Sequence, residues 1–277
     1  MKNILITFSG GRTSAFMATL INELPQYKDY NKLFLFANTG KELPETLDFI
    51  NRCATEFDID IEWLEAWVKD GKGNGTDYRI VSYENASRKG EPFEDVIKKY
   101  GLPSKLWRHC TRELKDKPIH KYAKEYFKGE KYVTALGIRA DEKHRLAKKK
   151  NYIYPLAEMN VDEEFVRNWW SRQSFDLGIK DYEGNCDLCF LKSKRKKLTL
   201  LLEKPELAEW WNNMEIANPT DKQPLFDVYR DLSIEDLVEQ SQQPFRKAID
   251  KHELRQKQNS LFEDEMDTEF DCFCKST

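Results

Sequence analysis

Residues 6–16, ITFSGGRTSAF, place two glycines between a short apolar run and the start of a helical pattern. Such a turn at the end of a buried strand directs backbone amides, hydroxyl groups and the positive end of a helix to one point, which suits a phosphate or sulfate group. The candidate anion-binding residues are Ser9, Gly10, Gly11, Arg12, Thr13 and Ser14. Neither G-x-x-x-x-G-K-[ST] nor G-x-G-x-x-G is present, and on spacing alone a structural turn with a Ser/Thr helix cap is an equal alternative.

A second turn of the same character lies in LFLFANTGKELPETLDFI, residues 33–50. Asn38, Thr39 and Gly40 follow the apolar run, and Pro44 occupies the first-turn position of a helix. Lys41 and Glu42 complete the turn. Because doubly wound sheets bind ligands at the carboxyl ends of their strands, two such turns favour a ligand site over two simple caps.

These turns require a sheet that holds them side by side. Short apolar runs at residues 4–8, 33–37, 60–64 and 132–138 predict buried strands, and helical patterns at 13–24 and 44–57 separate the first three. Strands alternating with helices of this length predict right-handed crossovers. The fold class is therefore α/β, with a doubly wound, mostly parallel sheet and a C-terminal helical appendage.

Three parts are predicted along the chain: an α/β nucleotide-binding domain over 1–150, a helical region with a C-x-x-C over 151–240, and a polar tail over 241–277 that ends in C-x-C. Helices are expected within 162–173 and 195–216, and a strand at 152–156 at most. The tryptophan pairs 169–170 and 210–211 are expected to pack the helical region.

The six cysteines, at 53, 110, 186, 189, 272 and 274, are too sparse for a disulfide scaffold. Cys186 and Cys189 have the spacing of a two-ligand knuckle, and Cys110 could supply a third ligand. His109 and the tail cysteines are candidates for the fourth. Thiolate ligands suit both an iron–sulfur cluster and zinc, so the cysteines alone do not identify the metal. Cys53 lies within a helical pattern and is predicted to be a buried free thiol.

Six motifs resemble those of the phosphoadenosine phosphosulfate (PAPS) reductase family, a branch of the adenine nucleotide α-hydrolases with an SGG-type phosphate loop (PP-loop). They occur in the family's order: SGGRTS (9–14), NTGKELPET (38–46), RHCTRELKDKP (108–118), LGIRADEKHR (136–145), YPLAEM (154–159) and YEGNCDLCFLKSKRKK (182–197). Many members read SGGKDS, where this chain has Arg12 and Thr13. Cluster-bearing reductases have a Cys-Cys pair where this chain has His109 and Cys110.

The resemblance implies an adenine nucleotide, either ATP or a sulfonucleotide (PAPS or APS), bound by both turns. At a third strand end it adds Gly137, Arg139 and Arg145, and the arginines flanking Cys110 (Arg108 and Arg112, with Lys115) belong to the same motif set. Arg12 and Arg139 would neutralise charge as the bond breaks. The implied cofactor is a four-iron four-sulfur cluster, with zinc as the alternative, and the metal ligand candidates are Cys110, Cys186, Cys189, Cys272 and Cys274.

The leading expectation is a PAPS reductase-like oxidoreductase that performs thiol- or cluster-assisted reduction of a sulfonucleotide, with a thioredoxin-like protein as reductant. In a rival role for the tail, Cys272 is the catalytic nucleophile, which excludes it as a stable cluster ligand. The first alternative is an ATP-dependent adenylating enzyme of sulfur transfer or nucleic-acid modification. The second is a non-catalytic nucleotide-sensing or nucleic-acid-binding module. Ser87 and Arg88, in a polar segment at 84–93, are hypothesised to contact substrate.

The net charge of -3 gives no overall attraction to nucleic acid or to an anionic membrane. Basic runs at 147–151 and 191–198 leave nucleic-acid binding as a minority interpretation. No apolar segment approaches the ~18 residues of a membrane span, and the N-terminal apolar run stops at Phe8, so no membrane partner and a cytoplasmic location are expected. A homo-oligomer is left open.

Overall fold

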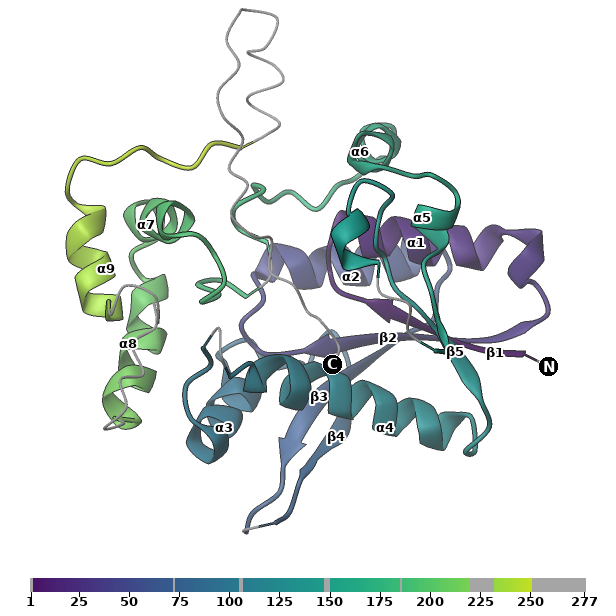
Figure 1. The fold of residues 1–277 in the computed structure, drawn as a ribbon, viewed down its shortest axis with the longest axis horizontal. Coiled ribbons are helices and arrows are strands. Elements are labelled where there is room, and N and C mark those ends of the chain that lie inside the picture. Colours follow the sequence, from purple (N-terminus) through teal and green to yellow (C-terminus); the bar gives the residue numbers. More distant parts are fainter. Residues whose placement is uncertain are drawn as a thin grey trace, which may run out of the picture. The chain divides into compact units, whose positions relative to one another are not determined.

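The computed structural model describes residues 2–71, 73–104, 107–146, 150–184, 186–219 and 232–250. The chain divides into two compact units (Figure 1). The α/β unit comprises Met1–Pro92 and Glu113–Gly178, and the helical unit comprises Phe93–Arg112 and Ile179–Thr277. The sulfur-rich tail residues Cys272 and Cys274 lie outside the described residues.

A six-stranded sheet forms the centre of the α/β unit, in the order β4-β3-β2-β1-β5-β6. Its strands are β1 (Lys2–Phe8), β2 (Tyr30–Asn38), β3 (Ile61–Val68), β4 (Thr76–Val81), β5 (Tyr132–Ala135) and β6 (Tyr152–Ile153). Every neighbouring pair is parallel except β3 and β4, which run antiparallel. The mostly parallel α/β fold predicted from the sequence is confirmed, with β1 at the point where the strand order reverses.

Edge strand β4 was not predicted, because its sequence TDYRIV carries Asp77 and Arg79 and is only half buried. Charged side chains are common on edge strands, where they discourage pairing with another chain. What places this segment in the sheet is its antiparallel register with β3, from Trp63 opposite Val81 to Val68 opposite Thr76.

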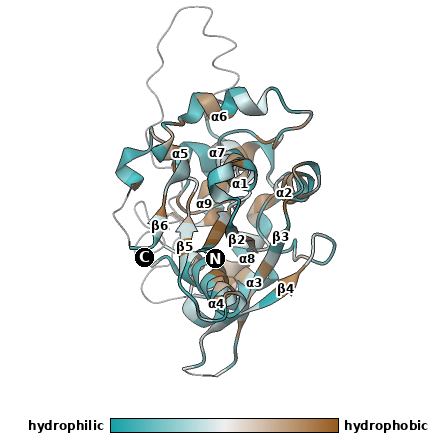
Figure 2. Ribbon diagram, turned by 90° about the vertical axis from the view of Figure 1, so that its right-hand side faces the viewer, coloured by the Kyte–Doolittle hydropathy of each residue, from teal (hydrophilic) through white to brown (hydrophobic). Residues whose placement is uncertain are grey.

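Helices cover both faces of the sheet: α1 (Arg12–Glu23) and α2 (Pro44–Glu56) lie on one face and α4 (Lys117–Tyr126) on the other (Figure 1). Under α4 the strands contribute Leu5, Leu33, Leu35, Ala37 and Leu64, and the helix contributes Ile119, Ala123 and Phe127. Hydrophobic residues are concentrated in the central strands (Figure 2). This two-sided burial explains why β1 and β2 read as continuous apolar runs rather than as alternating ones.

Two short helices complete the α/β unit: α5 (Pro155–Glu158) and α6 (Glu163–Trp170). The prediction that Trp169 and Trp170 pack the helical region was wrong, because both belong to the α/β unit. Trp169 contacts Phe16 of α1, with ring centroids 5.0 Å apart, and Trp170 contacts Phe49 of α2 at 4.9 Å. The indole N–H of Trp170 also donates to the carbonyl of Arg12, at 2.9 Å. Aromatic contacts therefore fix α6 against α1 and α2.

The helical unit contains most of α3 (Glu91–Tyr100), together with α7 (Lys194–Glu203), α8 (Leu207–Ala217) and α9 (Ile234–Ser241). Here the expected packing role of the second tryptophan pair is confirmed: Phe93 contacts the rings of Trp210 and Trp211. The Trp211 indole donates to Asp187 at 2.8 Å. No helix in the described part of the chain is long and apolar enough to cross a membrane.

Asp77 of β4 forms ion pairs with Lys69 and Lys121. From these pairs we predict that the stability of the protein depends on pH. Burial alone would raise the pKa of Asp77, but hydrogen bonds from Lys121 and Lys69 and from the Tyr78 amide outweigh burial and lower that pKa to about 2. The Nζ atoms lie 2.5 Å (Lys121) and 2.6 Å (Lys69) from the Asp77 carboxylate.

Since the folded-state pKa of Asp77 is depressed, its stabilisation is fully present above the unfolded value of about 3.9 and is lost as the pH falls toward 2. Asp77→Asn is expected to lower the free energy of unfolding at pH 7 by about 1–2 kcal/mol. Urea unfolding of wild type and variant between pH 7 and pH 2 measures this, and the difference should shrink below pH 4. A difference independent of pH would contradict the assignment.

Candidate functional site

The loop between β1 and α1 is shaped by Gly10. Its φ is +81°, and a Cβ atom at this position would lie 2.6 Å from Cγ2 of Thr46 in α2. Glycine is therefore required both by the left-handed backbone and by the close packing on α2. Gly11 is different, since the nearest atom to its Cβ position is Oγ of Ser9 at 3.8 Å. The protein's own packing leaves room for a side chain at Gly11, as expected if the space beside it is used by a ligand.

Ser14 holds this loop closed from the first turn of α1. Its hydroxyl donates to the carbonyl of Gly11 at 2.9 Å and accepts from the amide of Ser9 at 3.1 Å and from the Ser9 hydroxyl at 2.9 Å. Ser14 is buried, whereas Ser9 is exposed. The first intrahelical hydrogen bond runs from the amide of Ala15 to the carbonyl of Gly11. The amides before it are the free donors of a helix N-terminus, and α1 has no acidic residue in its first turn to compete for them.

The loop between β2 and α2 is held by two side chains of its own. The carboxamide oxygen of Asn38 accepts from the amide of Gly40 at 3.1 Å. The carboxylate of Glu42 accepts from the amide of Thr39 at 2.9 Å and from its hydroxyl at 2.8 Å. From the central Cys-containing motif, Lys115 reaches Glu42 at 3.9 Å. Lys41 is half-buried beside these groups.

Gly40 makes a close backbone contact with the segment that follows β4. Its φ is +78°, and a Cβ atom there would lie 3.0 Å from Cα of Gly90 and 3.1 Å from Cδ of Pro92. Segment 82–90 therefore lies against the second loop, near where the sequence placed a substrate contact. The Ser87 hydroxyl donates to Glu65, and the Arg88 guanidinium donates to the carbonyls of Tyr83 and Ala86. Substrate contact by Ser87 and Arg88 stays a prediction.

The third strand end reaches the first loop through Gly137 and Arg139. A Cβ atom on Gly137 would lie 3.2 Å from Cα of Ser14, so glycine permits the segment after β5 to approach the first turn of α1. The guanidinium of Arg139 donates to the hydroxyl of Thr13 at 3.2 Å. Thus three predicted groups of site residues, from the ends of β1, β2 and β5, meet at the carboxyl edge of the sheet.

Three of the predicted anion-binding arginines, Arg12, Arg139 and Arg145, are each paired with a carboxylate. Arg12 forms a bidentate pair with Asp176, at 2.6 and 2.8 Å. Arg145 pairs with Glu142. The guanidinium group of Arg12 therefore binds a carboxylate that lies 164 positions away in the sequence.

Arg139 is the most enclosed of these cations. Its pair with Asp141 is bidentate, with both distances 3.0 Å, and Glu163 lies 3.7 Å away. Burial alone would lower the pKa of Arg139, but the hydrogen bonds to Asp141 and the nearby carboxylates outweigh burial and raise it. For Asp141, burial would raise the pKa, and the Arg139 contact lowers it instead. Arg139 is thus a fixed positive charge beside the first loop.

Comparison with known proteins identifies the group to which these loops belong. The sequence model of the phosphoadenosine phosphosulfate reductase domain matches residues 3–75, which contain the first two loops. An uncharacterised nin region protein of Escherichia phage lambda is 35% identical over 197 residues, which are 69% of this chain and 67% of the phage protein. The chain belongs to the PAPS reductase-like family.

Three further proteins have lower sequence identity to this chain. Two uncharacterised proteins of Methanocaldococcus jannaschii are each 28% identical, over 77% and 45% of this chain, and the matches span only 41% and 24% of their own lengths. The crystal structure of PAPS reductase from Candida auris, a phosphate complex, aligns with a TM-score of 0.38 and 18% identity over 64% of this chain and 75% of that one. At the level of the family, the chain is a nucleotide-binding, enzyme-like protein.

Within this family the two unusual residues of SGGRTS have distinct partners. Arg12, which stands where many members have lysine, has the planar fork needed for its bidentate pair with Asp176. Thr13, which stands where many members have an acidic residue, accepts from Arg139 without adding a negative charge to the loop. Both departures therefore change how the loop is fixed and keep its positive potential.

The cysteines expected to bind a metal lie in the helical unit. Cys186 and Cys189 are buried in one turn, where the amide of Cys189 donates to the carbonyl of Cys186 at 3.2 Å, and Cys110 is half-buried. Among the residues that the structure describes, no three His, Cys, Asp or Glu side chains come together to hold a metal ion. A four-iron cluster and zinc both stay predictions, and no chemical step is assigned to either.

Sequence reasoning missed several residues that shape the site. Asp176 and Glu65 are carboxylates whose partners are distant in sequence, Glu142 binds its neighbours Arg139 and Arg145, and Thr46 acts through contact with Gly10. Thr46 lies within the motif NTGKELPET and Glu142 within LGIRADEKHR, so a local signal was available for both. For Asp176 and Glu65 no local pattern was available.

Proposed function

We propose that the α/β unit binds an adenine nucleotide, with the anionic end of the nucleotide on the loop Ser9–Ser14 and the rest along the loop Asn38–Glu42. The observation that carries the proposal is the contrast between the two glycines. Gly10 is required by the packing of the protein itself, whereas Gly11 borders open space at the N-terminus of α1. Small size at Gly11 is useful where an anion must approach backbone amides closely.

The reaction we propose is reduction of a sulfonucleotide. A cysteine thiolate would attack the sulfonate sulfur, forming an S–S bond while the S–O bond to the nucleotide phosphate breaks, and the nucleotide would leave with the bonding electrons on its phosphate oxygen. A thioredoxin-like dithiol would then attack the resulting S-sulfocysteine, release sulfite and end as a disulfide. Cys272, which lies outside the described residues, is our candidate for the nucleophile.

A second candidate is cleavage of ATP to an adenylate and pyrophosphate, and one observation favours it. The sole cysteine in the described residues of the α/β unit is Cys53, which is 0% exposed within α2 and whose pKa burial raises. A buried thiol with a raised pKa is a poor nucleophile. Reduction therefore requires a cysteine from another part of the chain, whereas attack on ATP requires none.

One experiment separates these functions. Full-length protein is incubated with PAPS, APS or ATP, with and without a dithiol reductant, and sulfite and pyrophosphate are measured. We expect sulfite from a sulfonucleotide, dependent on the dithiol and reduced at least about 1,000-fold in Cys272→Ser, because the nucleophile is lost. Pyrophosphate from ATP would favour the second candidate. Nucleotide binding without either product would favour a non-catalytic nucleotide-binding module.

A further inference from the structure

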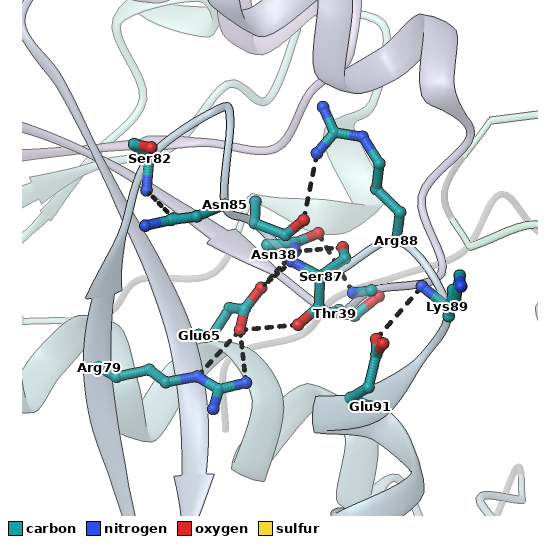
Figure 3. Close-up of polar contacts among 12 residues, drawn as sticks. Asn38, Thr39, Glu65, Arg79, Ser82, Asn85, Ser87, Arg88, Lys89 and Glu91 are labelled. Atoms are coloured by element: carbon teal, nitrogen blue, oxygen red, sulfur yellow. Dashed lines mark hydrogen bonds and ion pairs between the residues drawn. The ribbon is translucent and has the colours of Figure 1, made fainter.

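Glu65 is a buried carboxylate at the centre of the polar contacts behind the second loop (Figure 3). Glu65 is only 1% exposed to solvent. In the register of the sheet it lies directly opposite Asn38 of β2 on one side and opposite Arg79 of β4 on the other. The three side chains thus form a row across three strands that runs from the exposed edge of the sheet to the second loop.

Both carboxylate oxygens of Glu65 are supplied with donors. Oε1 accepts from Nδ2 of Asn38 at 2.7 Å and from the amide of Ser87 at 2.6 Å. Oε2 accepts from the hydroxyl of Ser87 at 3.0 Å and from Nε and Nη2 of Arg79 at 3.0 and 2.7 Å. A buried charge is tolerated when it is paired and fully hydrogen-bonded, and this one is.

These contacts fix the orientation of the Asn38 carboxamide. Its NH2 group donates to Glu65 and also to the carbonyl of Ser87, at 2.8 Å. If the carboxamide were rotated by half a turn, its oxygen would face two other acceptors, the carboxylate and the carbonyl. Rotation is therefore excluded, and the oxygen must point to the amide of Gly40.

The row of Asn38, Glu65 and Arg79 acts on the second loop through the amide of Gly40. Gly40 has a φ of +78° and lies in backbone contact with Gly90, so neither its conformation nor its neighbour can change freely. Glu65 acts on both sides of this contact. It acts on Gly40 through Asn38, and it acts on segment 82–90 through Ser87.

We infer that Glu65 is a positioning residue for the nucleotide: it holds the loop Asn38–Glu42 in the form that receives the ligand, without touching the ligand itself. The inference rests on the proposed function, since the ligand in question is the adenine nucleotide. It also assigns a role to hairpin β3–β4, which no sequence motif includes. Arg79, at the exposed edge, serves as the counter-charge of Glu65.

The test is nucleotide affinity in Glu65→Gln, measured by calorimetric titration with ATP, with APS and with PAPS. Glutamine keeps the size of the side chain but turns an NH2 group toward donors, so the Asn38 carboxamide loses its fixed orientation. We expect the dissociation constant to rise about tenfold. Glu62→Gln, on the same strand but outside these contacts, is the matched control and should leave affinity unchanged.

Two further measurements distinguish positioning from general destabilisation. Hydrogen exchange at the amide of Gly40 should be faster in Glu65→Gln than in Glu62→Gln. In a double-mutant cycle, Glu65→Gln should cost less affinity in the Asn38→Ala background than in the wild type, because part of its effect passes through the Asn38 carboxamide. If Glu65→Gln does not fold, Ser87→Ala removes a single hydrogen bond and should weaken binding about threefold.

The outcomes separate the inference from the proposed function. If the wild type binds none of ATP, APS and PAPS, the proposed function fails and the inference fails with it. If the wild type binds and Glu65→Gln binds as tightly, the inference alone is overturned. Unchanged exchange at Gly40, or additive losses in the double-mutant cycle, would overturn it equally.

Discussion

Gly10→Ala is expected to lower the free energy of unfolding by about 2–4 kcal/mol and to abolish measurable nucleotide binding. Two independent effects of the added Cβ atom cause this loss. The φ of +81° disfavours any side chain, and the new Cβ would lie 2.6 Å from Cγ2 of Thr46. The clash would be relieved if the first loop moved away from α2. This movement would misplace the backbone amides that we propose to bind the anion. Urea unfolding and nucleotide titration measure the two effects.

The adjacent glycine should behave in the opposite way. Gly11→Ala is expected to cost no more than about 0.5 kcal/mol of stability, since Gly11 has ordinary backbone angles and open space, but to weaken nucleotide binding about tenfold or more. Its methyl group would occupy the space through which the anion approaches. Equal affinities of Gly11→Ala and wild type would argue against an anion at this loop.

Gly129 provides the control for backbone strain alone. Its φ of +77° is close to that of Gly10, and nothing lies within 4 Å of its Cβ position. Gly129→Ala is expected to cost about 1 kcal/mol and to leave nucleotide binding intact. If Gly10→Ala is no less stable than Gly129→Ala, the contact with Thr46 contributes nothing.

Arg139→Met is expected to lower the free energy of unfolding by about 2–4 kcal/mol and to weaken nucleotide binding severely. The variant leaves Asp141 without its bidentate partner, removes one of the cations near Glu142 and Glu163, and removes the donor to Thr13. The added net negative charge would make the potential at the first loop less favourable for an anionic ligand. Both effects are read from unfolding and nucleotide titration at pH 7.

The pH dependence gives a second readout for Arg139. Arg139 lowers the pKa of Asp141 in the folded state, so the stabilisation is present above the unfolded value of about 3.9 and is lost as the pH falls through the depressed folded value. Arg139→Met should lose this part of the acid sensitivity. Arg167→Met is the matched control, because Arg167 also pairs with Glu163 but belongs to α6 and not to the segment after β5. It should cost less than about 1 kcal/mol and leave affinity unchanged.

The two loops that we propose to bind the nucleotide could be predicted from the sequence because their signals are local. A buried strand is a short run of apolar residues, and the turn after it shows its glycines, hydroxyls and helix start within a few positions. Parallel strands separated by helices share one edge for their carboxyl ends, so the sequence also brought the turns after β1, β2 and β5 to one place. The helix boundaries of α1 and α2 fall within a residue of those predicted.

Only the tertiary structure decided which polar groups from distant segments meet. Asp176 pairs with Arg12 across 164 positions, and Glu65 binds Ser87 across 22, and no local pattern marks either pair. The same is true of Trp169 and Trp170, whose apolar faces suit any core and which pack on α1 and α2 only because of where the chain returns.

By itself, the sequence determined the class of fold, the family and the turns that could hold an anion, because each depends on hydrogen bonding and burial patterns within about twenty residues. The tertiary structure decided the orientation of the Asn38 carboxamide, the position of hairpin β3–β4 and the pairing of Arg12 with Asp176. It also decided that Phe93–Arg112 groups with the C-terminal helices. These features depend on contacts between distant segments, whose partners are chosen by the packing of the whole unit and not by any one stretch of the chain.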